Sequence, residues 1–247
     1  MSLSGISSWR RLAIVPARGG SKGLPGKNLA VIGGVTLLAR AVACARESGA
    51  FDKIIVSTDD PAIAEEGERA GASVPFLRPP TLASDTAAVI DAIRDVLARL
   101  ADAGEPAFDL VALLEPTSPL RTPEIIRRTV EAAEMDGCDA ALTVSEVPLR
   151  YHPLKQFRLD REGNVRHYAK DGASVVNRQE LTPTYVRNGQ CYAVRTTALS
   201  AGHGILGAMP RAVVVEGPIV NIDDAEDLAL ARRLIEGSSA LEQQRSP

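Results

Sequence analysis

Aromatic side chains are scarce in this sequence, because Phe, Trp and Tyr make up 4% of its 247 residues. The apolar residues, 45% of the chain, are therefore mainly Ala, Val, Leu and Ile, which are typical of a sheet covered by helices on both faces. The three cysteines and three histidines show neither a Cys-x-x-Cys nor a zinc-type spacing. We therefore expect reduced, buried thiols and no histidine-bound metal.

The sequence also lacks a strong charge of one sign and any long apolar run. Its net charge of −3 gives no electrostatic footprint for nucleic acid or an anionic membrane. No run approaches the roughly 18 apolar residues of a membrane span, and the first nine residues lack the charged start and apolar centre of a secretory signal. We expect a cytoplasmic protein that binds neither nucleic acid nor membrane.

Short apolar runs alternate with helical patterns along the chain, which predicts an α/β fold with a mostly parallel, twisted sheet. Asp60 before Pro61 and Thr122 before Pro123 each combine an N-cap residue with proline at the first helical position. Ligands bind such sheets at the carboxyl ends of the strands. Strands are predicted over 12–15, 54–57, 110–114, 140–144 and 213–215, and helices over 36–47, 61–70, 86–100, 123–135 and 225–235.

One segment interrupts this alternation. From about 147 to 184 the sequence is polar, with basic residues spread among turns, prolines and aromatics, and it is too long for a plain loop. The residues alone leave open a solvated excursion and an interchain contact. We treat 1–247 as one domain, in which 147–187 is an insertion.

A glycine-rich, basic loop follows the first predicted strand. Residues 16–28 read PARGGSKGLPGKN, in which four glycines let the backbone approach a ligand and three cations can hold phosphates. A Walker A loop is excluded because Ser21 stands where its first glycine is required and Asn28 replaces its Ser or Thr. The dinucleotide fingerprint is excluded because no two glycines are two residues apart. An ordinary turn with solvated lysines is the alternative.

The run IVPARGGSKGLPGKN resembles the loop of the acylneuraminate cytidylyltransferases, the CMP-sialic acid synthetases. Further segments match that family in the same order: FLRPPTLASDTA (76–87), LLEPTSPLR (113–121), YHPLK (151–155), RNGQCY (187–192) and NIDDAEDL (221–228). The resemblance covers nearly the whole chain. It implies a Rossmann-like nucleotidyltransferase fold, Mg²⁺ as cofactor, CTP and a sugar acid as substrates, and a homodimer whose insertion reaches the partner's active site.

In the implied reaction, the anomeric hydroxyl of the sugar attacks the α-phosphorus of CTP, so the protein has to position the reactants and spread charge. The resemblance gives catalytic roles to Arg18, Lys27 and Asp223. Ser84, Asp85 and Thr86 could also cap the next helix, and the two roles can coexist. The other implied contacts are Ser21, Lys22 and Asn28 with the nucleotide and its phosphates, Arg78, Ser84 and Asp85 with cytosine and ribose, and Glu115, Thr117, Ser118, Lys155, Arg178 and Arg187 on the sugar side.

Two residues depart from the family pattern. Asn221 stands where the family has the first Asp of a metal-binding Asp-Ile-Asp, whereas Asp223 keeps the second position. As metal ligands, Asn221 and Asp223 would bind Mg²⁺ more weakly than the two aspartates of the family do, because an amide oxygen brings no charge. Triphosphate oxygens would then supply more of the coordination sphere. Glu115 stands where the family has Gln, and a carboxylate only accepts hydrogen bonds. We therefore expect a nonulosonic acid such as legionaminic, pseudaminic or another modified sugar acid, rather than plain N-acetylneuraminate.

Three alternatives stay open: GTP in place of CTP, an octulosonate in place of the nonulosonate, and a nucleotide-binding paralogue with impaired catalysis. Residues 19–23, Gly-Gly-Ser-Lys-Gly, disfavour the octulosonate enzymes, which are expected to have Ser-Thr-Arg in this loop. Retention of Arg18, Lys27 and Asp223 argues against lost catalysis.

Overall fold

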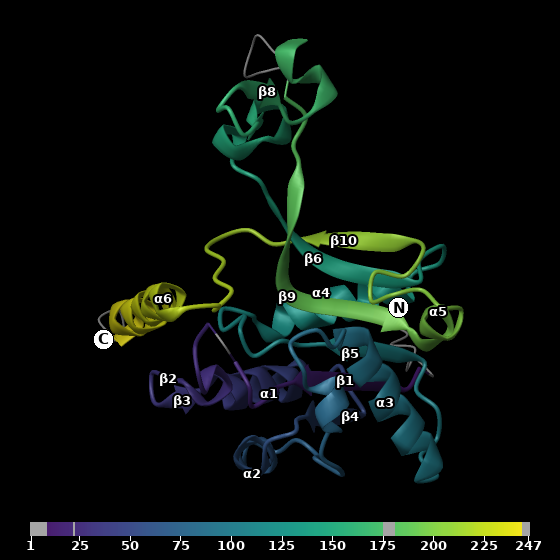
Figure 1. Cartoon of the computed structure of the whole chain (residues 1–247). Coiled ribbons are helices and arrows are strands. Elements are labelled where there is room, and N and C mark those ends of the chain that lie inside the picture. The colour runs from purple at the N-terminus through teal and green to yellow at the C-terminus, as the bar shows by residue number, and fades with distance from the viewer. Residues whose placement is uncertain (1–8, 22, 175–180, 244–247) are drawn as a thin grey trace, which may run out of the picture.

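The computed structural model describes residues 9–21, 23–174 and 181–243, so the predicted contacts of Lys22 and Arg178 lie outside the described residues. A six-stranded sheet with the order β10-β6-β9-β5-β1-β4 forms the centre of the fold (Figure 1). β9 runs antiparallel to both of its neighbours, and the other pairs are parallel. The strands are β1 (Arg11–Pro16), β4 (Lys53–Ser57), β5 (Leu110–Leu113), β6 (Ala140–Glu146), β9 (Tyr185–Arg195) and β10 (Pro210–Val214).

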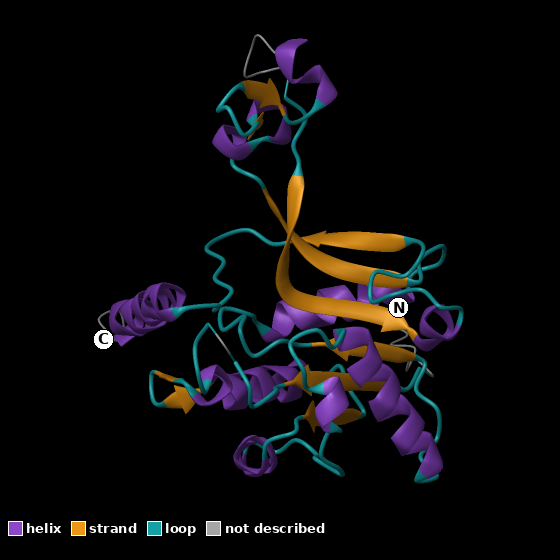
Figure 2. Ribbon diagram, viewed as in Figure 1, coloured by secondary structure: helices purple, strands orange, loops and turns teal. Residues whose placement is uncertain are grey.

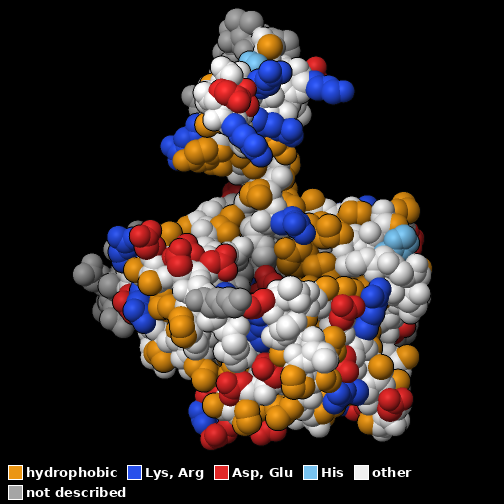
Figure 3. Space-filling model, in the orientation of Figure 1, with side chains coloured by type: hydrophobic (Ala, Val, Ile, Leu, Met, Phe, Trp, Pro, Cys, Tyr) orange, Lys and Arg blue, Asp and Glu red, His pale blue; other side chains and the backbone are white. Residues whose placement is uncertain are grey.

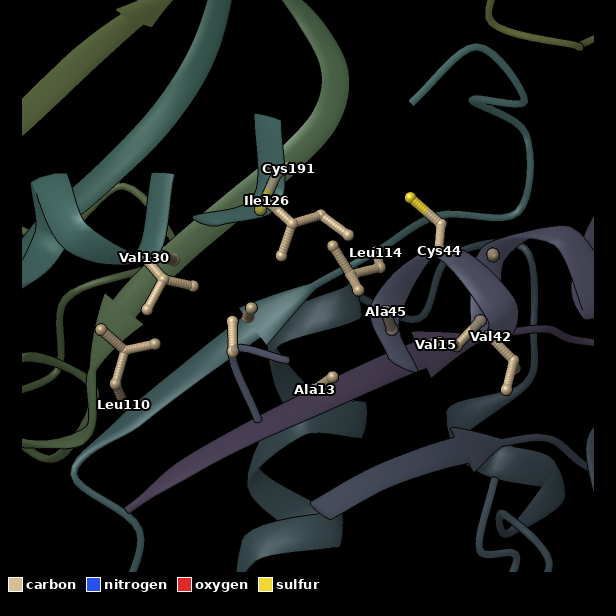
Figure 4. Close-up of a cluster of buried hydrophobic side chains, with 14 of the residues drawn as sticks. Ala13, Val15, Val42, Cys44, Ala45, Leu110, Leu114, Ile126, Val130 and Cys191 are labelled. Carbon is tan, nitrogen blue, oxygen red and sulfur yellow. The ribbon is translucent and has the colours of Figure 1, made fainter. Parts of the chain in front are cut away.

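Helices cover both faces of this sheet, as expected for the α/β class (Figure 2). Side chains of β1 alternate between the faces, because Ala13 and Val15 join one core cluster and Leu12 and Ile14 join the other. Figure 4 shows the first cluster. One face carries α1 (Leu37–Ser48), α2 (Pro61–Arg69) and α4 (Pro123–Glu134), and the other carries α3 (Val89–Asp102) and α5 (Thr196–Ser200).

The last helix, α6 (Ala225–Gln243), packs outside the sheet. Its Leu228 and Ala231 join a third apolar cluster with Ile32 and Leu37, which belong to the short hairpin β2 (Val31–Ile32) and β3 (Val35–Thr36) and to α1. In the described part of the chain, no helix has both the length and the apolar run needed to cross a membrane. The cluster fixes the segment before α6 beside the glycine-rich loop.

The predicted helix starts at 61, 123 and 225 are confirmed, and the predicted start at 86 is wrong. Asp60 accepts hydrogen bonds from the amides of Ala62 and Ile63 at the start of α2, and Thr122 accepts one from Ile125 at the start of α4. α3 begins at Val89, after an N-cap residue that makes no side-chain bond, and not at residue 86. Ser84, Asp85 and Thr86 therefore do not cap a helix.

β9 was missed by the sequence analysis because its centre is polar. Leu142 of β6 lies opposite Tyr192, whereas Val144 lies opposite Arg187, so residues 188–191 form a bulge. Thr143 replaces the missing ladder bonds, because its hydroxyl donates to the Cys191 carbonyl and accepts from the Cys191 amide. The bulge bends β9 where it leaves the sheet (Figure 1).

The insertion between β6 and β9 stands away from the rest of the fold (Figure 1). It contains the hairpin β7 (Phe157–Leu159) and β8 (Val165–His167), in which every residue is exposed. A backbone bond of 2.8 Å from Val147 to Thr184 closes its neck. Short 3-10 helices over Leu149–Tyr151, Pro153–Lys155 and Lys170–Ser174 make up most of the remainder, and two others, Lys27–Leu29 and Pro80–Leu82, lie in the main body.

Candidate active site

A cleft of about 350 Å³ opens where β1, β4 and β5 end, at the carboxyl edge of the parallel strands. Polar and charged side chains from four separate segments line it, and Leu82, Ala87 and Val89 supply an apolar wall. Most of the predicted site residues come together there: Arg18, Ser21, Lys27, Asn28, Arg78, Ser84, Asp85, Glu115, Thr117, Asn221 and Asp223.

The glycine-rich loop forms one side of this cleft. Gly23 packs so closely on the backbone carbonyl of Asp223 that a Cβ atom there would overlap it, so a larger residue would push the two segments apart. Asn28 is buried and its Nδ2 donates to the Arg18 carbonyl over 2.9 Å. Asn28 therefore fixes the course of the loop as well as facing the cleft.

Two cations of the loop each meet a carboxylate across the cleft. Arg18 Nη1 lies 2.7 Å from Asp85 Oδ1, and Lys27 Nζ lies 3.5 Å from Asp223 Oδ1. Lys27 also donates to the Ile222 carbonyl over 3.3 Å. Both cations stay partly exposed, at 34% and 20% of their side-chain surface, so they can also reach a bound anion.

Arg78 forms the floor of the cleft next to the end of β4. It is buried, and its guanidinium donates to the hydroxyl and the carbonyl of Ser57 over 3.1 and 2.5 Å. Burial lowers the pKa of Arg78, while the nearby carboxylates of Asp59 and Asp95 oppose that shift. Arg78 is thus a rigid donor with a fixed orientation.

Glu115 follows β5 and faces the cleft beside the loop cations. Burial raises the pKa of its carboxyl group, with Arg121 and Lys27 acting against that shift. The pKa of Tyr192 is also raised, first by burial and then by the charge of Glu115. The Glu115 side chain is therefore partly desolvated, and a donor group of a ligand would be favoured opposite its carboxylate.

The loop after β5 is tied to two other segments. Ser118 does not line the cleft but lies buried behind it, with its Oγ 3.0 Å from the Gly189 carbonyl and 2.6 Å from Asn221 Oδ1. A backbone bond of 2.9 Å from Ile222 to Thr117 adds a second tie. These contacts place Glu115 and Thr117 opposite Asp223.

Arg121 was given no role by the sequence analysis, although it ends the LLEPTSPLR motif. It is buried and its guanidinium donates to the carbonyls of Glu115 and Gln190, the former over 2.6 Å. Burial lowers its pKa. Arg121 lies between a proline-containing loop and the N-cap residue Thr122, which is an unusual position for a solvated cation. This position was the only signal in the sequence for a buried role of Arg121.

Two predicted sugar contacts lie outside the cleft of their own chain. Lys155 is exposed on the insertion. Arg187 lines a neighbouring hollow of about 410 Å³ with Ile90, Ile205 and Leu206, which shares Ala88 and Val89 with the main cleft. Arg187 thus stands near the mouth of the cleft, whereas Lys155 would have to act elsewhere.

Asp223 and Asn221 differ as possible ligands of a divalent cation. The Asp223 side chain is 84% exposed, so its oxygens are accessible. The Asn221 oxygen already contacts Ser118 at 2.6 Å. In the described residues no three His, Cys, Asp or Glu side chains gather in a metal-binding group. Asp223 therefore fits a cation that takes its other oxygen ligands from a bound phosphate.

The sequence is similar to a family and to curated relatives over most of its length. Residues 12–238 match the family described as "Cytidylyltransferase". The chain is 34% identical to the CMP-N,N'-diacetyllegionaminic acid synthase of Legionella pneumophila, over 92% of this chain and 97% of that protein. It is 30% identical to the pseudaminic acid cytidylyltransferase of Campylobacter jejuni, over 91% and 96%. Against the N-acylneuraminate cytidylyltransferase of Streptococcus agalactiae it is 37% identical, over 73% of this chain but 42% of that protein.

Solved structures share the fold at low identity. A CMP:2-keto-3-deoxy-manno-octonic acid synthetase complexed with CTP matches 93% of this chain and 99% of its own, with a TM-score of 0.67 and 17% identity. A 4-diphosphocytidyl-2C-methyl-D-erythritol synthase matches with a TM-score of 0.62 and 16% identity. At these identities the likeness extends to the fold.

Proposed function

The chain belongs to the cytidylyltransferase family, whose members are nucleotidyltransferase enzymes, and on that premise we propose that it transfers CMP from CTP to a nonulosonic acid. The observation that carries the proposal is the meeting of the glycine-rich loop, Glu115 and Asp223 in one cleft at the carboxyl edge of the sheet. Relatives similar over more than 90% of the chain are named for legionaminic and pseudaminic acids, which supports this substrate class.

In the proposed reaction, the anomeric oxygen of the sugar forms a bond to the α-phosphorus of CTP. The bond from that phosphorus to the oxygen bridging to the β-phosphate breaks, pyrophosphate leaves, and the hydroxyl proton passes to solvent. Arg18, Ser21 and Lys27 would hold the phosphates, because their loop approaches the cleft closely and its two described cations are partly exposed there. Their charge stabilises the negative charge that accumulates during transfer.

The nucleotide would lie between the loop and residues 82–89. Arg78 is a rigid donor on the cleft floor, suited to a base carbonyl, and Ser84 and Asp85 stand on the opposite wall beside Arg18. Asp223 would hold Mg²⁺ together with phosphate oxygens. When bound, the ion neutralises charge on the triphosphate.

The sugar would bind between the loop after β5 and Arg187. Its carboxylate needs a counter-charge, and the guanidinium of Arg187 near the cleft mouth provides one. Glu115 would face a donor group on the sugar, since its carboxylate accepts but does not donate. This preference separates modified nonulosonic acids from N-acetylneuraminate.

A homodimer formed through the insertion is part of the proposal. Lys155 and Arg178 would then serve the cleft of the partner chain, since Lys155 lies outside the cleft of its own chain. An isolated two-stranded hairpin is marginal in water, and apolar and basic side chains gather on the visible face of the insertion (Figure 3). Large apolar side chains that are at least 50% exposed there or at its neck are Tyr151, Phe157, Leu159, Val165, Tyr168, Tyr185 and Val186.

The proposed location is the cytoplasm. The cysteines Cys44, Cys138 and Cys191 are free and buried, which fits a reducing compartment. Burial raises the pKa of Cys44 to about 11 and that of Cys191 to about 12, so these two thiols are poor nucleophiles.

A matrix of four nucleoside triphosphates against legionaminic, pseudaminic, N-acetylneuraminic and 3-deoxy-manno-octulosonic acids tests the function, with pyrophosphate release as the readout. The proposal predicts release that requires CTP together with a nonulosonic acid. Release with GTP only, or with the octulosonate only, would contradict it. Binding of CTP without release in any combination would identify a paralogue that has lost catalysis.

A further inference from the structure

Asn221 lies where three segments that are far apart in the sequence meet. The hydroxyl of Ser118 is 2.6 Å from Asn221 Oδ1 and 3.0 Å from the Gly189 carbonyl. Ser118 is only 2% exposed, so its hydroxyl depends on these partners and not on bulk water. The contacts join the loop after β5, the bulge of β9 and the segment before α6.

The Asn221 amide is also held from its other side. Gly189 has a φ of +71°, and a Cβ atom there would lie 2.9 Å from both Nδ2 and Oδ1 of Asn221. The amide therefore packs directly against the Cα of Gly189. Asn221 is exposed at the edge of the cleft, yet the Ser118 contact and the packing on Gly189 already engage its side chain.

The Ser118 hydroxyl has one proton, and its shorter contact is the one in which it donates to Asn221 Oδ1 over 2.6 Å. Asn221 is therefore the acceptor that orients this hydroxyl beside the Gly189 carbonyl. Removing either side chain would leave the other without its partner at a joint where Ser118 is buried.

We propose that Asn221 is a positioning residue that holds Ser118 against Gly189, and that Asp223 alone supplies a protein carboxylate to the divalent cation. The inference rests on the proposed function only in assigning a cation to this cleft. Asp223 is 84% exposed, and no group of three ligating side chains gathers among residues 9–21, 23–174 and 181–243. The nucleotide then brings most of the oxygen ligands, and the nucleotide-free protein binds a cation weakly.

The part of the proposal that concerns the metal is tested by titrating the full-length protein with Mn²⁺ in the absence of nucleotide and sugar. Electron paramagnetic resonance measures the bound and free ion. Asn221→Ala should change the Mn²⁺ affinity by less than about twofold, since no ligand is lost. Asn221→Asp should also stay within about twofold, because a side chain held at Ser118 does not reach the cation, whereas Asp223→Asn should lower the affinity about tenfold or more through the loss of a charged oxygen ligand. A tenfold loss in Asn221→Ala, a tenfold gain in a folded Asn221→Asp, or no loss in a folded Asp223→Asn would overturn the inference.

Asp224→Asn is the matched control for local charge. Asp224 is next to Asp223, but its Oδ1 accepts from the amides of Glu226 and Asp227 at the start of α6. An asparagine keeps that cap and removes one negative charge. Its Mn²⁺ affinity should stay within about twofold of the wild-type value, and a larger loss would mean that general charge and not ligation controls binding.

Hydrogen exchange of the backbone amides in 188–191 tests whether Asn221 holds Ser118 against Gly189. Ser118→Ala and Asn221→Ala should each accelerate exchange there, about tenfold, and the double variant should go no further, because both remove one joint. A double variant with the product of the two single effects, about a hundredfold, would overturn the joint. Neither measurement uses turnover, so a wrong substrate assignment would leave both outcomes unchanged.

Discussion

Lys27 and Asp223 face each other across the cleft with 3.5 Å between Nζ and Oδ1, although 196 positions separate them in the sequence. The lysine is 20% exposed and the carboxylate 84%. In the proposed complex both turn to the same triphosphate, the lysine directly and the carboxylate through a cation. The pair thus places both groups beside the site proposed for the triphosphate.

Replacing Lys27 by alanine tests its electrostatic role. Lys27→Ala should lower kcat about 10²- to 10³-fold at saturating CTP, the usual loss for one preorganised charge contact. Lys53→Ala is the control, because Lys53 is 25% exposed and pairs with Glu105 outside the cleft. Steady-state kinetics of both variants are the measurement, and unchanged turnover in Lys27→Ala would remove Lys27 from the mechanism.

The pKa of Glu115 predicts how stability depends on pH. Its folded pKa is raised by burial, so its contribution to stability is present below the unfolded pKa of about 4.3 and is lost as pH rises through the folded value. Glu115→Gln should therefore be more stable than the wild type at pH 7, and the difference should shrink toward pH 4. Denaturant unfolding of nucleotide-free protein across this range measures it.

Glu105→Gln provides a control, because its effect on stability should depend on pH in the opposite direction. Hydrogen bonding to Lys53 lowers the pKa of Glu105, so its contribution is present above the unfolded pKa and is lost as pH falls. This variant should be the less stable one at pH 7 and should approach the wild type in acid. A constant difference between Glu115→Gln and the wild type at every pH would show that Glu115 is not the titrating group.

Glu115 should also set the choice of sugar. A carboxylate facing a neutral acetamido carbonyl opposes two acceptors, which costs on the order of 1 to 3 kcal/mol, or about tenfold to a hundredfold in preference. Glu115→Gln should shift kcat/KM toward N-acetylneuraminate relative to the preferred sugar, with little change in the KM for CTP. If nucleotide preference changes instead, Glu115 contacts the base.

We expect two chains to form a dimer through the insertion. Leu159 on β7 is 71% exposed, and a charge there would have to be buried in the proposed dimer. Leu159→Asp should sediment as a monomer at concentrations where the wild type is a dimer. Met209→Asp, at a 60% exposed position on the main body, should remain dimeric. A monomeric wild type with full activity would contradict this account.

Much of the sheet and of the cleft could be predicted because their signals are local. Leu12 to Val15 is a continuous apolar run, and Asp60 before Pro61 is a local signal for the start of a helix. The cleft residues follow from where such strands end. The course of β9 could not be predicted, because Asn188 and Gln190 are polar yet only 2% exposed, and their burial depends on a bulge set by another strand. Arg121 was missed for the same reason, since its partners are backbone carbonyls brought close by the fold.

The fate of the anomeric oxygen tests the central claim most directly. A nonulosonic acid labelled with ¹⁸O at that position is incubated with CTP, Mg²⁺ and the protein, and both products are analysed by mass spectrometry. Transfer of CMP to the sugar predicts that the label is retained in a CMP-sugar and is absent from pyrophosphate. Label in the pyrophosphate, or hydrolysis of CTP to CMP without a sugar conjugate, would contradict the account.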